Sequence, residues 1–458
     1  MLRIYNTRTN KIDQFEPNDL IGIYTCGPTV YNRVHIGNIR TFFWSDFIVG
    51  FLEYLYPKQV LAIMNITDID DKILKRLPEQ TIKELLNFTK EYTDKFFLDM
   101  SKMSIMRYHN HYHKVTDNIE NIQEIILKLL DKGFAYRNNI DGSIYFDSSK
   151  IKDYPFPLFK KESRDISEFE NNRNIIRNSG VKDPRDFVLW KVKDNEFIDW
   201  DANIGKGRPG WHIECSAIAL NHLPNVTIHI GGEDLKFPHH TCEILQSESY
   251  DEEKMFGKYW MHIGFLNFNG DKMSKSIGNI LYLEDIKENP FLIRYYLFTK
   301  HYRKFADFNI DDMLTYKINF INLHIFYNKL KLGLIKYVVD EKYHHDDIFN
   351  EMKQNILNDF DTPTAIKKLN SFIDFWLNKH ISLKQRNEFI DMLDKMNLLF
   401  KIIDNDLINI DNEIMEKLKL KEKYRSDKNF EISDNIRNEL KKSYIVEDYH
   451  NGVSIIKK

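Results

Sequence analysis

The sequence is poor in the features of secreted and membrane proteins. Its 458 residues include only three cysteines, and such an odd, low number argues against a disulfide framework and for a reducing compartment. The most apolar stretch, residues 42–56, is interrupted by Ser45, Asp46 and Glu53, so no run is long enough to cross a membrane. The first residues show no secretory pattern. We therefore expect a cytoplasmic protein that makes no contact with membranes.

An excess of charge of one sign is also missing. The formal net charge is −3, although 29% of the residues are charged. A polyanionic partner such as a nucleic acid would therefore have to bind a local cationic surface. Two lysine-rich runs, residues 329–336 and 417–425, are candidates for such a surface. A solvated helix face is the ordinary interpretation of both runs, and for the first run it is the better one.

The sequence does contain two phosphate-binding motifs, far apart in the chain. Residues 272–276 read Lys-Met-Ser-Lys-Ser, and residues 35–38 read His-Ile-Gly-Asn. A given pentamer arises by chance in a chain of this length with odds of about 10⁻⁴. An ordinary solvated turn could also hold two lysines, but agreement with the whole pentamer argues against it. Lys272 and Lys275 would supply two cations on a mobile loop.

The shorter motif suits the phosphates of a nucleoside triphosphate. Attack of a carboxylate on an α-phosphate spreads negative charge over the phosphoryl oxygens, so catalysis is mostly positioning and electrostatic stabilisation. The motif follows an apparent strand at residues 22–25 and begins an apparent helix, whose N-terminus favours anions. His35 and Asn38 share a face of that helix. Gly37 lets the backbone approach the nucleotide closely.

A turn after another apparent strand completes the predicted nucleotide site. Residues 225–230 alternate as a strand does, and Gly-Gly-Glu-Asp follows at residues 231–234. Ligands of open parallel sheets bind at the carboxyl ends of the strands, so Asp234 is placed to bind ribose hydroxyls. Taken alone, the turn has little specificity and could be an ordinary loop.

The cysteines lie near other residues that bind metals. Cys26 ends the strand before the His-Ile-Gly-Asn motif, and His239 and Glu243 are four apart in an apparent helix, so that both can face one ion. With Cys215, these side chains form a plausible zinc site. Buried cysteines are more often inert core residues, and the sequence has no close Cys-x-x-Cys pair. The residues alone therefore leave both interpretations open.

Several longer motifs resemble those of one family. They are Thr-Cys-Gly-Pro-Thr-Val-Tyr at residues 25–31, Asn-Ile-Thr-Asp-Ile-Asp-Asp-Lys at 65–72, Gly-Arg-Pro-Gly-Trp-His-Ile-Glu-Cys-Ser-Ala at 207–217 and Phe-Pro-His-His at 237–240. Together with the two phosphate motifs, they resemble the cysteinyl-tRNA synthetases, which are class I aminoacyl-tRNA synthetases. The resemblance covers nearly the whole chain and is densest between residues 24 and 279.

The resemblance implies an enzyme, active as a monomer, that activates L-cysteine with ATP and Mg²⁺ and loads it onto tRNA(Cys). The implied ATP site consists of His35, Gly37, Asn38, Asp234, Lys272, Ser274 and Lys275. Four of these residues are implied to be catalytic, namely His35, Asn38, Lys272 and Lys275. The implied contacts of the amino acid are Thr67, Trp211 and Cys26. The implied ligands of one zinc ion, which accepts the substrate sulfur, are Cys26, Cys215, His239 and Glu243.

The sequence departs from the family pattern in several places, including Ile230 and Glu233 before Asp234 and a missing aromatic residue near the C-terminus, and two departures fall within the predicted site. Asn38 stands where the family has a second histidine, so a hydrogen-bonding group is kept but the option of a positive charge is lost. Cys242 lies three residues after His239 and is a conceivable rival ligand, although we prefer Glu243. Neither departure removes a group that the proposed chemistry requires.

The order of apparent strands and helices predicts an α/β protein whose core is a doubly wound, Rossmann-like parallel sheet. The expected segments are a catalytic core at residues 1–105 and 200–280, a connective insertion at 106–199, a linker contacting the tRNA stem at 281–310, a tRNA-binding helical bundle at 311–410 and a small α+β anticodon-binding domain at 411–458. The wide apolar helix faces between residues 311 and 410 support the bundle.

Other functions share parts of this pattern. An enzyme that ligates cysteine to an amino sugar uses a similar core but needs neither the bundle nor the basic tail. A non-catalytic tRNA-binding relative would be expected to lose the lysine motif or the zinc ligands. An adenylyltransferase with a similar His-x-Gly-x turn is usually far shorter and lacks the lysine pentamer. Amino-acid-dependent pyrophosphate exchange distinguishes these functions.

Overall fold

The computed structural model describes residues 1–79, 81–108, 110–152, 180–192, 198–201, 203–273, 278–338, 347–449 and 452–458. These residues form two compact units. The first comprises Met1–Ile286 with Tyr302–Asp307, and the second comprises Lys287–His301 with Phe308–Lys458. Ser274 and Lys275 of the lysine motif lie outside the described residues.

The first unit is built on a parallel sheet of five strands. In spatial order they are β11 (Tyr259–Ile263), β10 (Ile228–Gly232), β3 (Ile21–Thr25), β4 (Val60–Ile66) and β5 (Tyr112–Lys114). Every neighbouring pair is parallel. The chain therefore leaves β3 toward β4 in its first half and returns to the other side of β3 with β10, which confirms the doubly wound sheet. β5 belongs to this sheet although it lies beyond residue 105, where we expect the first core segment to end.

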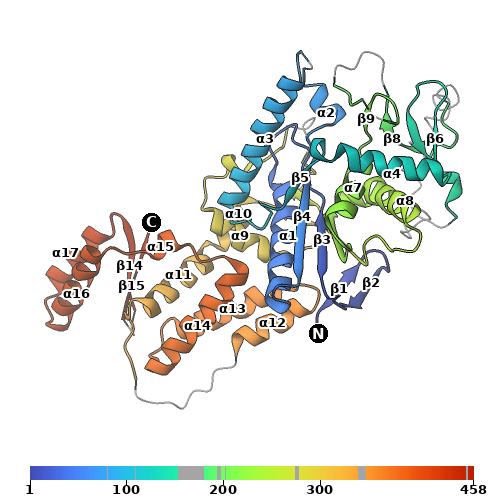
Figure 1. Cartoon of the computed structure of the whole chain (residues 1–458). Helices are drawn as coiled ribbons and strands as arrows, with labels where there is room; N and C mark the ends of the chain where they lie inside the picture. The colour runs from blue at the N-terminus through green and yellow to red at the C-terminus, as the bar shows by residue number, and fades with distance from the viewer. Residues whose placement is uncertain are drawn as a thin grey trace. The chain divides into compact units, whose positions relative to one another are not determined.

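Helices cover both faces of this sheet (Figure 1). In that view α1 (Ile36–Leu55) and α3 (Ile82–Lys102) lie on one side, and α4 (Ile119–Asp131), α7 (Ile213–His222) and α8 (Thr241–Tyr250) lie on the other. The central strands β3 and β10 are consequently buried along their whole length, as is typical of parallel sheets. Helix α1 is apolar on nearly all sides, and Phe43, Trp44 and Phe47 are buried, so its sequence suits a helix inside the core.

Smaller sheets surround this core. An antiparallel hairpin of β1 (Arg3–Asn6) and β2 (Lys11–Gln14) begins the chain. A second antiparallel sheet has the order β6 (Ala135–Arg137), β7 (Ile144–Phe146), β8 (Phe187–Lys191) and β9 (Arg208–Pro209). Most of this second sheet falls in the predicted insertion, and β9 joins it from the region that we assign to the core. The short strands β12 (Leu266–Phe268) and β13 (Ala306–Phe308) complete the strands of this part of the chain.

The second unit is mostly helical. Its helices are α9 (Pro290–Phe298), α10 (Ile310–Thr315), α11 (Lys317–Lys331), α12 (Ile348–Leu357), α13 (Thr362–Trp376), α14 (Leu383–Phe400), α15 (Asn405–Ile408), α16 (Asn412–Ser426) and α17 (Phe430–Leu440). Capping residues define the N-termini of two of these helices. Asp361 caps α13, and Ser382 and Gln385 form a capping box at α14. Aromatic rings of α11, α13 and α14 pack together in the bundle core, where Phe372 contacts both Phe326 and Phe389.

The chain ends in a small α+β domain within this second unit. Strands β14 (Tyr444–Tyr449) and β15 (Gly452–Lys457) form an antiparallel hairpin, and α16 and α17 contact each other and the hairpin around one apolar core. Leu418, Leu440 and Ile455 are buried in that core. Among the described residues of the whole chain, no helix is both long and apolar enough to span a bilayer.

Candidate active site

The His-Ile-Gly-Asn motif forms the start of α1 at the carboxyl end of β3. Nδ1 of His35 accepts hydrogen bonds from the backbone N–H groups of Gly37 and Asn38, at 3.1 and 3.3 Å. In return Oδ1 of Asn38 accepts the N–H of His35 at 3.2 Å. This reciprocal arrangement is a capping box. Because the carbonyl oxygen of the Asn38 amide is used by the cap, its NH₂ group remains as a donor toward a ligand.

A cavity of about 310 Å³ opens beside this helix start. Its lining includes Cys26, His35, Asn38 and Asp234, so the structure brings four of the predicted site residues together. Cys26 follows β3, and Asp234 lies in the short helix η4 (Glu233–Leu235) directly after β10. The cavity therefore lies where two adjacent parallel strands end, which is the expected ligand position in this type of sheet.

The segments flanking the lysine motif contact the His-Ile-Gly-Asn turn. The N–H of Ile36 donates to the carbonyl of Leu281 at 2.9 Å, and a Cβ at Gly37 would approach Cε of Met273 to 2.9 Å. A side chain at position 37 would therefore crowd the terminal methyl group of Met273 and the ring of His35, and both would have to shift. Lys272 is exposed, and its Nζ lies 5.1 Å from the centre of the Phe265 ring.

Four predicted ligands form a buried cluster. Cys26, Cys215, His239 and Glu243 each offer an atom, and these atoms lie within 4.8 Å of one another. Sγ of Cys26 is 4.0 Å from Sγ of Cys215 and 3.4 Å from Oε1 of Glu243, and Nε2 of His239 is 2.8 Å from the same oxygen. Bonds of 2.0–2.3 Å in a tetrahedron place zinc ligands about 3.3–3.8 Å apart. The cluster therefore has the donor types of a zinc site, and its spacings of 2.8–4.0 Å bracket the expected range, so only small side-chain shifts would be needed to hold the ion.

The other three ligands of the cluster come from helical elements in the second half of the core. Cys215 lies in the first turn of α7 and Glu243 in the first turn of α8. His239 precedes Glu243 by one turn, in the helical turn η5 (Lys236–His240). The sequence predicts that His239 and Glu243, four residues apart, face one ion. The structure confirms that both side chains reach the same cluster of ligand atoms.

The electrostatics of the cluster favour deprotonated ligands at two positions. Burial opposes ionisation of Glu243, but the imidazoles of His229 and His239 outweigh it and lower the pKa of Glu243 to about 2. Burial likewise favours the neutral thiol of Cys215, but the hydrogen bond from Cys26, together with the charge and hydrogen bond of His239, outweighs it and lowers the pKa of Cys215 to about 6. Burial raises the pKa of Cys26 well above that of an ordinary thiol. A dication would favour loss of the proton that the two cysteines share.

Two histidines that the sequence analysis missed belong to this site. Cys26, His229, His240 and Glu243 also lie close enough together to hold one ion. His229 comes from the buried strand β10, where it stands between two isoleucines, and it resembles a core residue in the sequence. Cys242 is buried and belongs to neither group of ligand atoms among the described residues. The geometry therefore favours Glu243 over Cys242 as the fourth metal ligand.

The predicted contacts of the amino acid surround the cluster. The Trp211 ring packs against His239, with centroids 4.9 Å apart, and it is 40% exposed, so it can cover a ligand on the metal side. Thr67 follows β4 and is buried, and its hydroxyl donates to Oε1 of Glu214 at 2.6 Å. Glu214 is a further residue that the sequence analysis missed, although it lies within the motif that contains Trp211 and Cys215.

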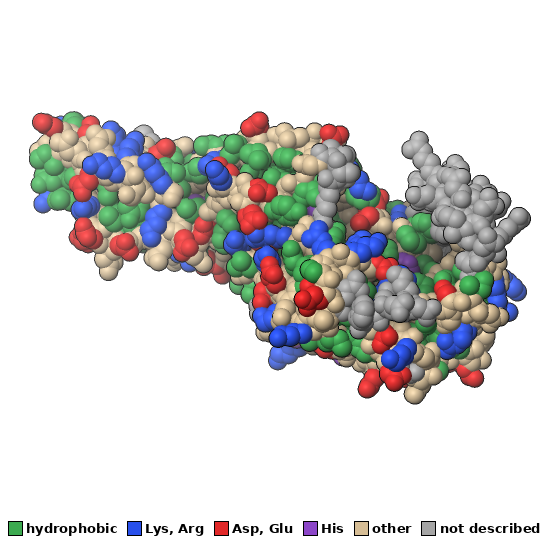
Figure 2. All heavy atoms as spheres, turned by 90° about the horizontal axis from the view of Figure 1, so that it is seen from above, with side chains coloured by type: hydrophobic (Ala, Val, Ile, Leu, Met, Phe, Trp, Pro, Cys, Tyr) green, Lys and Arg blue, Asp and Glu red, His purple; other side chains and the backbone are tan. Residues whose placement is uncertain are grey.

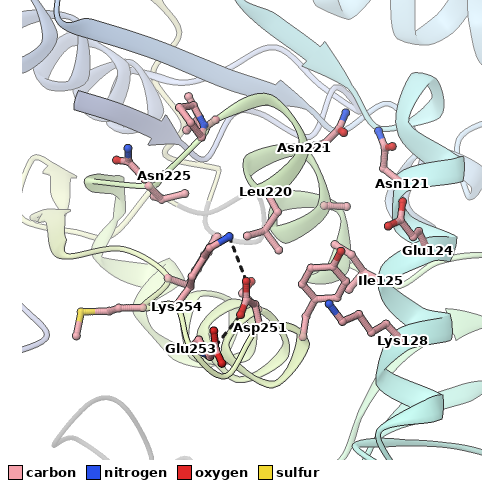
Figure 3. A pocket seen from close by; sticks show the side chains of 18 residues that line it. Asn121, Glu124, Ile125, Lys128, Leu220, Asn221, Asn225, Asp251, Glu253 and Lys254 are labelled. Atoms are coloured by element: carbon pink, nitrogen blue, oxygen red, sulfur yellow. Dashed lines mark hydrogen bonds and ion pairs between the residues drawn. The ribbon is translucent and has the colours of Figure 1, made fainter. Parts of the chain in front are cut away.

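A larger cavity lies at the opposite ends of the strands. It measures about 550 Å³ and is lined from α4, α7, α8 and the segments that precede β10 and β11. Figure 3 shows Lys254, Asp251 and Glu253 on one side of it and Glu124 and Lys128 on the other, and Lys254 pairs with Asp251 at 3.2 Å. Nζ of Lys128 lies 4.1 Å from the centre of the Tyr250 ring. None of the predicted site residues lines this cavity, and several of its charges are already paired.

The lysine-rich run at residues 417–425 differs from the expected cationic surface. Lys421 is buried and its ammonium contacts Asp448, which also pairs with Arg425 at 2.9 Å. The prediction that the run as a whole offers a cationic surface is therefore wrong at Lys421, because this side chain belongs to the domain interior. Figure 2 shows Lys and Arg side chains interspersed with Asp and Glu on the face that it presents.

The other lysine-rich run also contains a buried member. Lys329 is buried and donates to the carbonyl of Leu377 at 2.9 Å. Its ammonium lies 4.3 Å from the centre of the Tyr449 ring. The interpretation of this run as a solvated helix face is therefore wrong at Lys329.

Comparisons with known proteins agree with this geometry. The family model of the class I (C) tRNA synthetase catalytic domain matches residues 12–317. Cysteine–tRNA ligase of Clostridioides difficile is 35% identical, covering 99% of both chains, and that of Methanococcus maripaludis is 34% identical, covering 100% of this chain and 99% of the other. Cysteine–tRNA ligase of Geobacillus sp. strain WCH70 is 34% identical, with 98% of both chains covered.

A solved structure supports the fold independently of sequence. Mycobacterium tuberculosis methionyl-tRNA synthetase in complex with methionyl-adenylate superposes with a TM-score of 0.56 at 12% identity, covering 84% of this chain and 90% of the other. At this low identity the likeness concerns the fold alone. The whole-length sequence matches and the family model show that the chain belongs to the cysteine–tRNA ligase family of class I aminoacyl-tRNA synthetases.

Proposed function

We propose that this protein activates L-cysteine with ATP and Mg²⁺ and transfers it to the 3′-terminal ribose of tRNA(Cys), with one zinc ion selecting the amino acid. A single observation carries the proposal. Cys26 both lines the nucleotide cavity and belongs to the metal-ligand cluster. A thiol-recognising centre and a nucleotide site therefore share one wall, as joining cysteine to an adenylate requires.

The cluster residues would provide the selectivity. Cysteine differs from serine by one atom, and a hydrophobic pocket discriminates such small differences poorly. Zinc bound by Cys26, Cys215, His239 and Glu243 supplies a soft acceptor for a thiolate, and a serine hydroxyl ionises far less readily than a thiol of pKa near 8.5. Trp211 covers this end of the site and excludes water. This selection needs no separate editing domain.

The residues around the cavity would provide the phosphate chemistry. Asp234 accepts hydrogen bonds from ribose hydroxyls. The N-terminus of α1 and the free amide NH₂ of Asn38 stabilise negative charge on the phosphates, and His35 holds that helix start in shape through its cap. Lys272, Ser274 and Lys275 would close over the triphosphate. Asn38 donates as a neutral group, so the two lysines carry the positive charge in this mechanism.

The second unit, together with residues 281–286 and 302–307 of the first unit, would bind the tRNA. We assign residues 281–310 to the acceptor stem, residues 311–410 to the body of the tRNA and residues 411–458 to the anticodon end. The helical bundle and the α+β domain described above support this division. We further propose that the protein acts in the cytoplasm as a monomer.

Pyrophosphate exchange tests the proposal. The full-length protein is incubated with ATP, labelled pyrophosphate and cysteine, serine or alanine. We expect exchange with cysteine at least a hundredfold faster than with serine or alanine, and charging of tRNA(Cys) in the second step. Exchange that does not depend on cysteine, or that is equally fast with serine, would refute the proposed selectivity.

A further inference from the structure

Two of the three cysteines lie close enough to react with each other. Sγ of Cys26 is 4.0 Å from Sγ of Cys215, and neither residue is in a disulfide. A disulfide bond is about 2.05 Å long, so the two sulfur atoms need to approach by about 2 Å. Cys26 follows β3 and Cys215 lies in the first turn of α7. A bond between them would therefore cross-link the two halves of the core.

The two thiols differ in their access to small molecules. Cys26 is among the residues that line the nucleotide cavity, and Cys215 is not. The exposed fraction is 4% for Cys26 and 1% for Cys215. A small polar oxidant that enters the cavity therefore meets Cys26 first. Cys215 is then the thiol within reach of a group formed on the sulfur of Cys26.

The predicted zinc set links this thiol pair to the metal. Two Zn–S bonds of about 2.3 Å in a tetrahedron place their sulfur atoms about 3.8 Å apart, close to the 4.0 Å between Cys26 and Cys215. The pair therefore stays together whether or not the ion is bound. A disulfide would remove both thiolate ligands at once and leave His239 and Glu243 of the set. Structural and substrate-binding zinc takes more ligands than these two, so the ion would be released.

We propose that Cys26 and Cys215 are an oxidation site, at which hydrogen peroxide forms a reversible disulfide and expels the metal. The Cys26 thiolate attacks one peroxide oxygen, the O–O bond breaks, and the departing hydroxide takes up a proton to give water. Cys26 is then a sulfenic acid. The Cys215 thiolate attacks its sulfur, the S–O bond breaks, and the second hydroxide also takes up a proton. Two thiolates, one peroxide and two protons thus give one disulfide and two waters.

The proposal rests on the proposed function for its consequence, because loss of the ion would remove the selection of cysteine. The thiol chemistry itself is measured without catalysis. The amino acid that this site would select is also a thiol, and it oxidises to a disulfide under the same conditions. Oxidation of Cys26 and Cys215 would therefore stop activation when the reduced amino acid becomes scarce.

Peroxide treatment of the zinc-loaded, full-length protein tests the proposal. We expect two of the three thiols of each chain to be lost, zinc to pass to a chromophoric chelator at the same rate, and cysteine-dependent pyrophosphate exchange to stop. A reductant followed by added zinc should reverse all of these changes. Mass spectrometry of the digested protein should find the peptides of Cys26 and Cys215 joined. Persistence of every thiol, or joined peptides that contain Cys242, would overturn the proposal.

Single cysteine variants test the order of the two steps. Cys215→Ser should form no disulfide, and dimedone should trap the sulfenic acid at Cys26. Cys26→Ser should give no dimedone adduct at Cys215, because Cys215 does not line the cavity. Cys242→Ser is the control and should form the disulfide as the wild type does, since Cys242 belongs to neither group of ligand atoms. Equal trapping at Cys26 and Cys215 would overturn the assignment of Cys26 as the first thiol to react.

The wild-type measurement separates this proposal from the proposed function. Reduced protein that exchanges pyrophosphate without cysteine would overturn the proposed function, whatever the thiols do. Reduced protein that depends on cysteine, but whose thiols and zinc survive peroxide, would overturn the oxidation site alone. The wild-type result decides both questions even where a cysteine variant fails to fold.

Discussion

Nε2 of His229 lies 2.6 Å from Oε2 of Glu243, and both side chains are completely buried. One oxygen of the carboxylate is therefore held by an imidazole. The other oxygen, Oε1, faces Cys26 and His239. The histidine thus determines which oxygen of Glu243 points at the metal position and removes the freedom of the carboxylate to rotate.

Replacement of His229 should weaken metal binding without removing a predicted ligand. Residues that orient metal ligands typically contribute 10- to 100-fold in affinity. We expect His229→Asn to lower the zinc affinity by about this factor, measured by competition with a chromophoric chelator. The partly exposed His222 provides a matched control, because His222→Asn changes a histidine of the same unit away from the cluster. Equal affinities of the two variants would show that His229 does not orient Glu243.

The cysteines should differ sharply in their effect on metal content. We expect about one zinc per chain in the wild type. Cys215→Ser should lose the metal and the preference for cysteine, because it removes a thiolate ligand. Cys242→Ser should keep both, since Cys242 lies outside the ligand groups. Elemental analysis measures the metal, and normal zinc in Cys215→Ser or its absence from Cys242→Ser would refute the assignment.

The lysine motif should act on the rate of activation. Lys275 is predicted from the sequence to stabilise charge only during phosphoryl transfer. Lys275→Ala should therefore raise the barrier by about 2–4 kcal/mol and change ATP affinity much less. Single-turnover kinetics separates the two quantities. Lys254→Ala, which alters a lysine paired with Asp251 in the same unit, should leave both unchanged. A large loss of affinity at an unchanged rate would make Lys275 a binding residue only.

The buried Lys421 makes the C-terminal domain depend on Asp448. Among the described residues, Asp448→Ala would leave the buried ammonium of Lys421 with Glu422 as its remaining ion-pair partner. We expect this change to destabilise the domain by about 3 kcal/mol, as is typical of a broken buried pair. Glu447→Ala changes the exposed neighbouring residue and should have little effect. Hydrogen exchange within residues 412–457 measures the difference, and equal protection in both variants would contradict it.

The pH dependence of stability should reveal the buried Lys329. Burial lowers the pKa of Lys329 to about 8, whereas an unfolded lysine titrates near 10.4. Between these values the unfolded chain binds more protons than the folded chain, so the free energy of unfolding rises with pH in this window. Below about pH 8 both states are protonated and the contribution is constant. Lys329→Met should abolish this part of the rise.

Urea unfolding at several pH values between 7.5 and 10 tests the Lys329 prediction. The quantity of interest is the wild-type free energy of unfolding minus that of the variant. Lys331→Met is the matched control, because hydrogen bonds to Asp394 and Tyr327 outweigh burial and raise the pKa of Lys331. A difference that does not vary with pH would mean that Lys329 keeps an ordinary pKa in the folded protein.

The sequence predicted the parts of the site that depend on local spacing. His35 and Asn38 share one helix start, and His239 and Glu243 lie one turn apart, so short-range periodicity was sufficient. The parallel sheet was predictable from strands that are apolar throughout. The whole zinc set still needed the family resemblance, because the sequence separation between Cys26 and Cys215 says nothing about their distance in space.

Other features depend on packing that no local pattern reveals. His229 alternates with isoleucines on a buried strand, and only the tertiary structure shows that its ring meets Glu243. Lys421 looks like its exposed neighbours, and its burial depends on Asp448, which the hairpin β14–β15 places beside it. Glu214 lies within a recognised motif, but no local pattern shows that it contacts Thr67, which follows β4.

The position of β3 between β4 and β10 has a consequence for synthesis of the chain. β3 can pair with β4 early. Its other edge stays unpaired until β10 has been synthesised, roughly 200 residues later. At about 5–20 residues per second on the ribosome, this edge stays uncovered for roughly 10–40 s, together with the thiol of Cys26 beside it. An uncovered apolar strand edge is a template for wrong pairing. We therefore expect the yield of folded protein to depend on shielding of this edge, by a chaperone or by the ribosome, until the second half of the sheet has emerged.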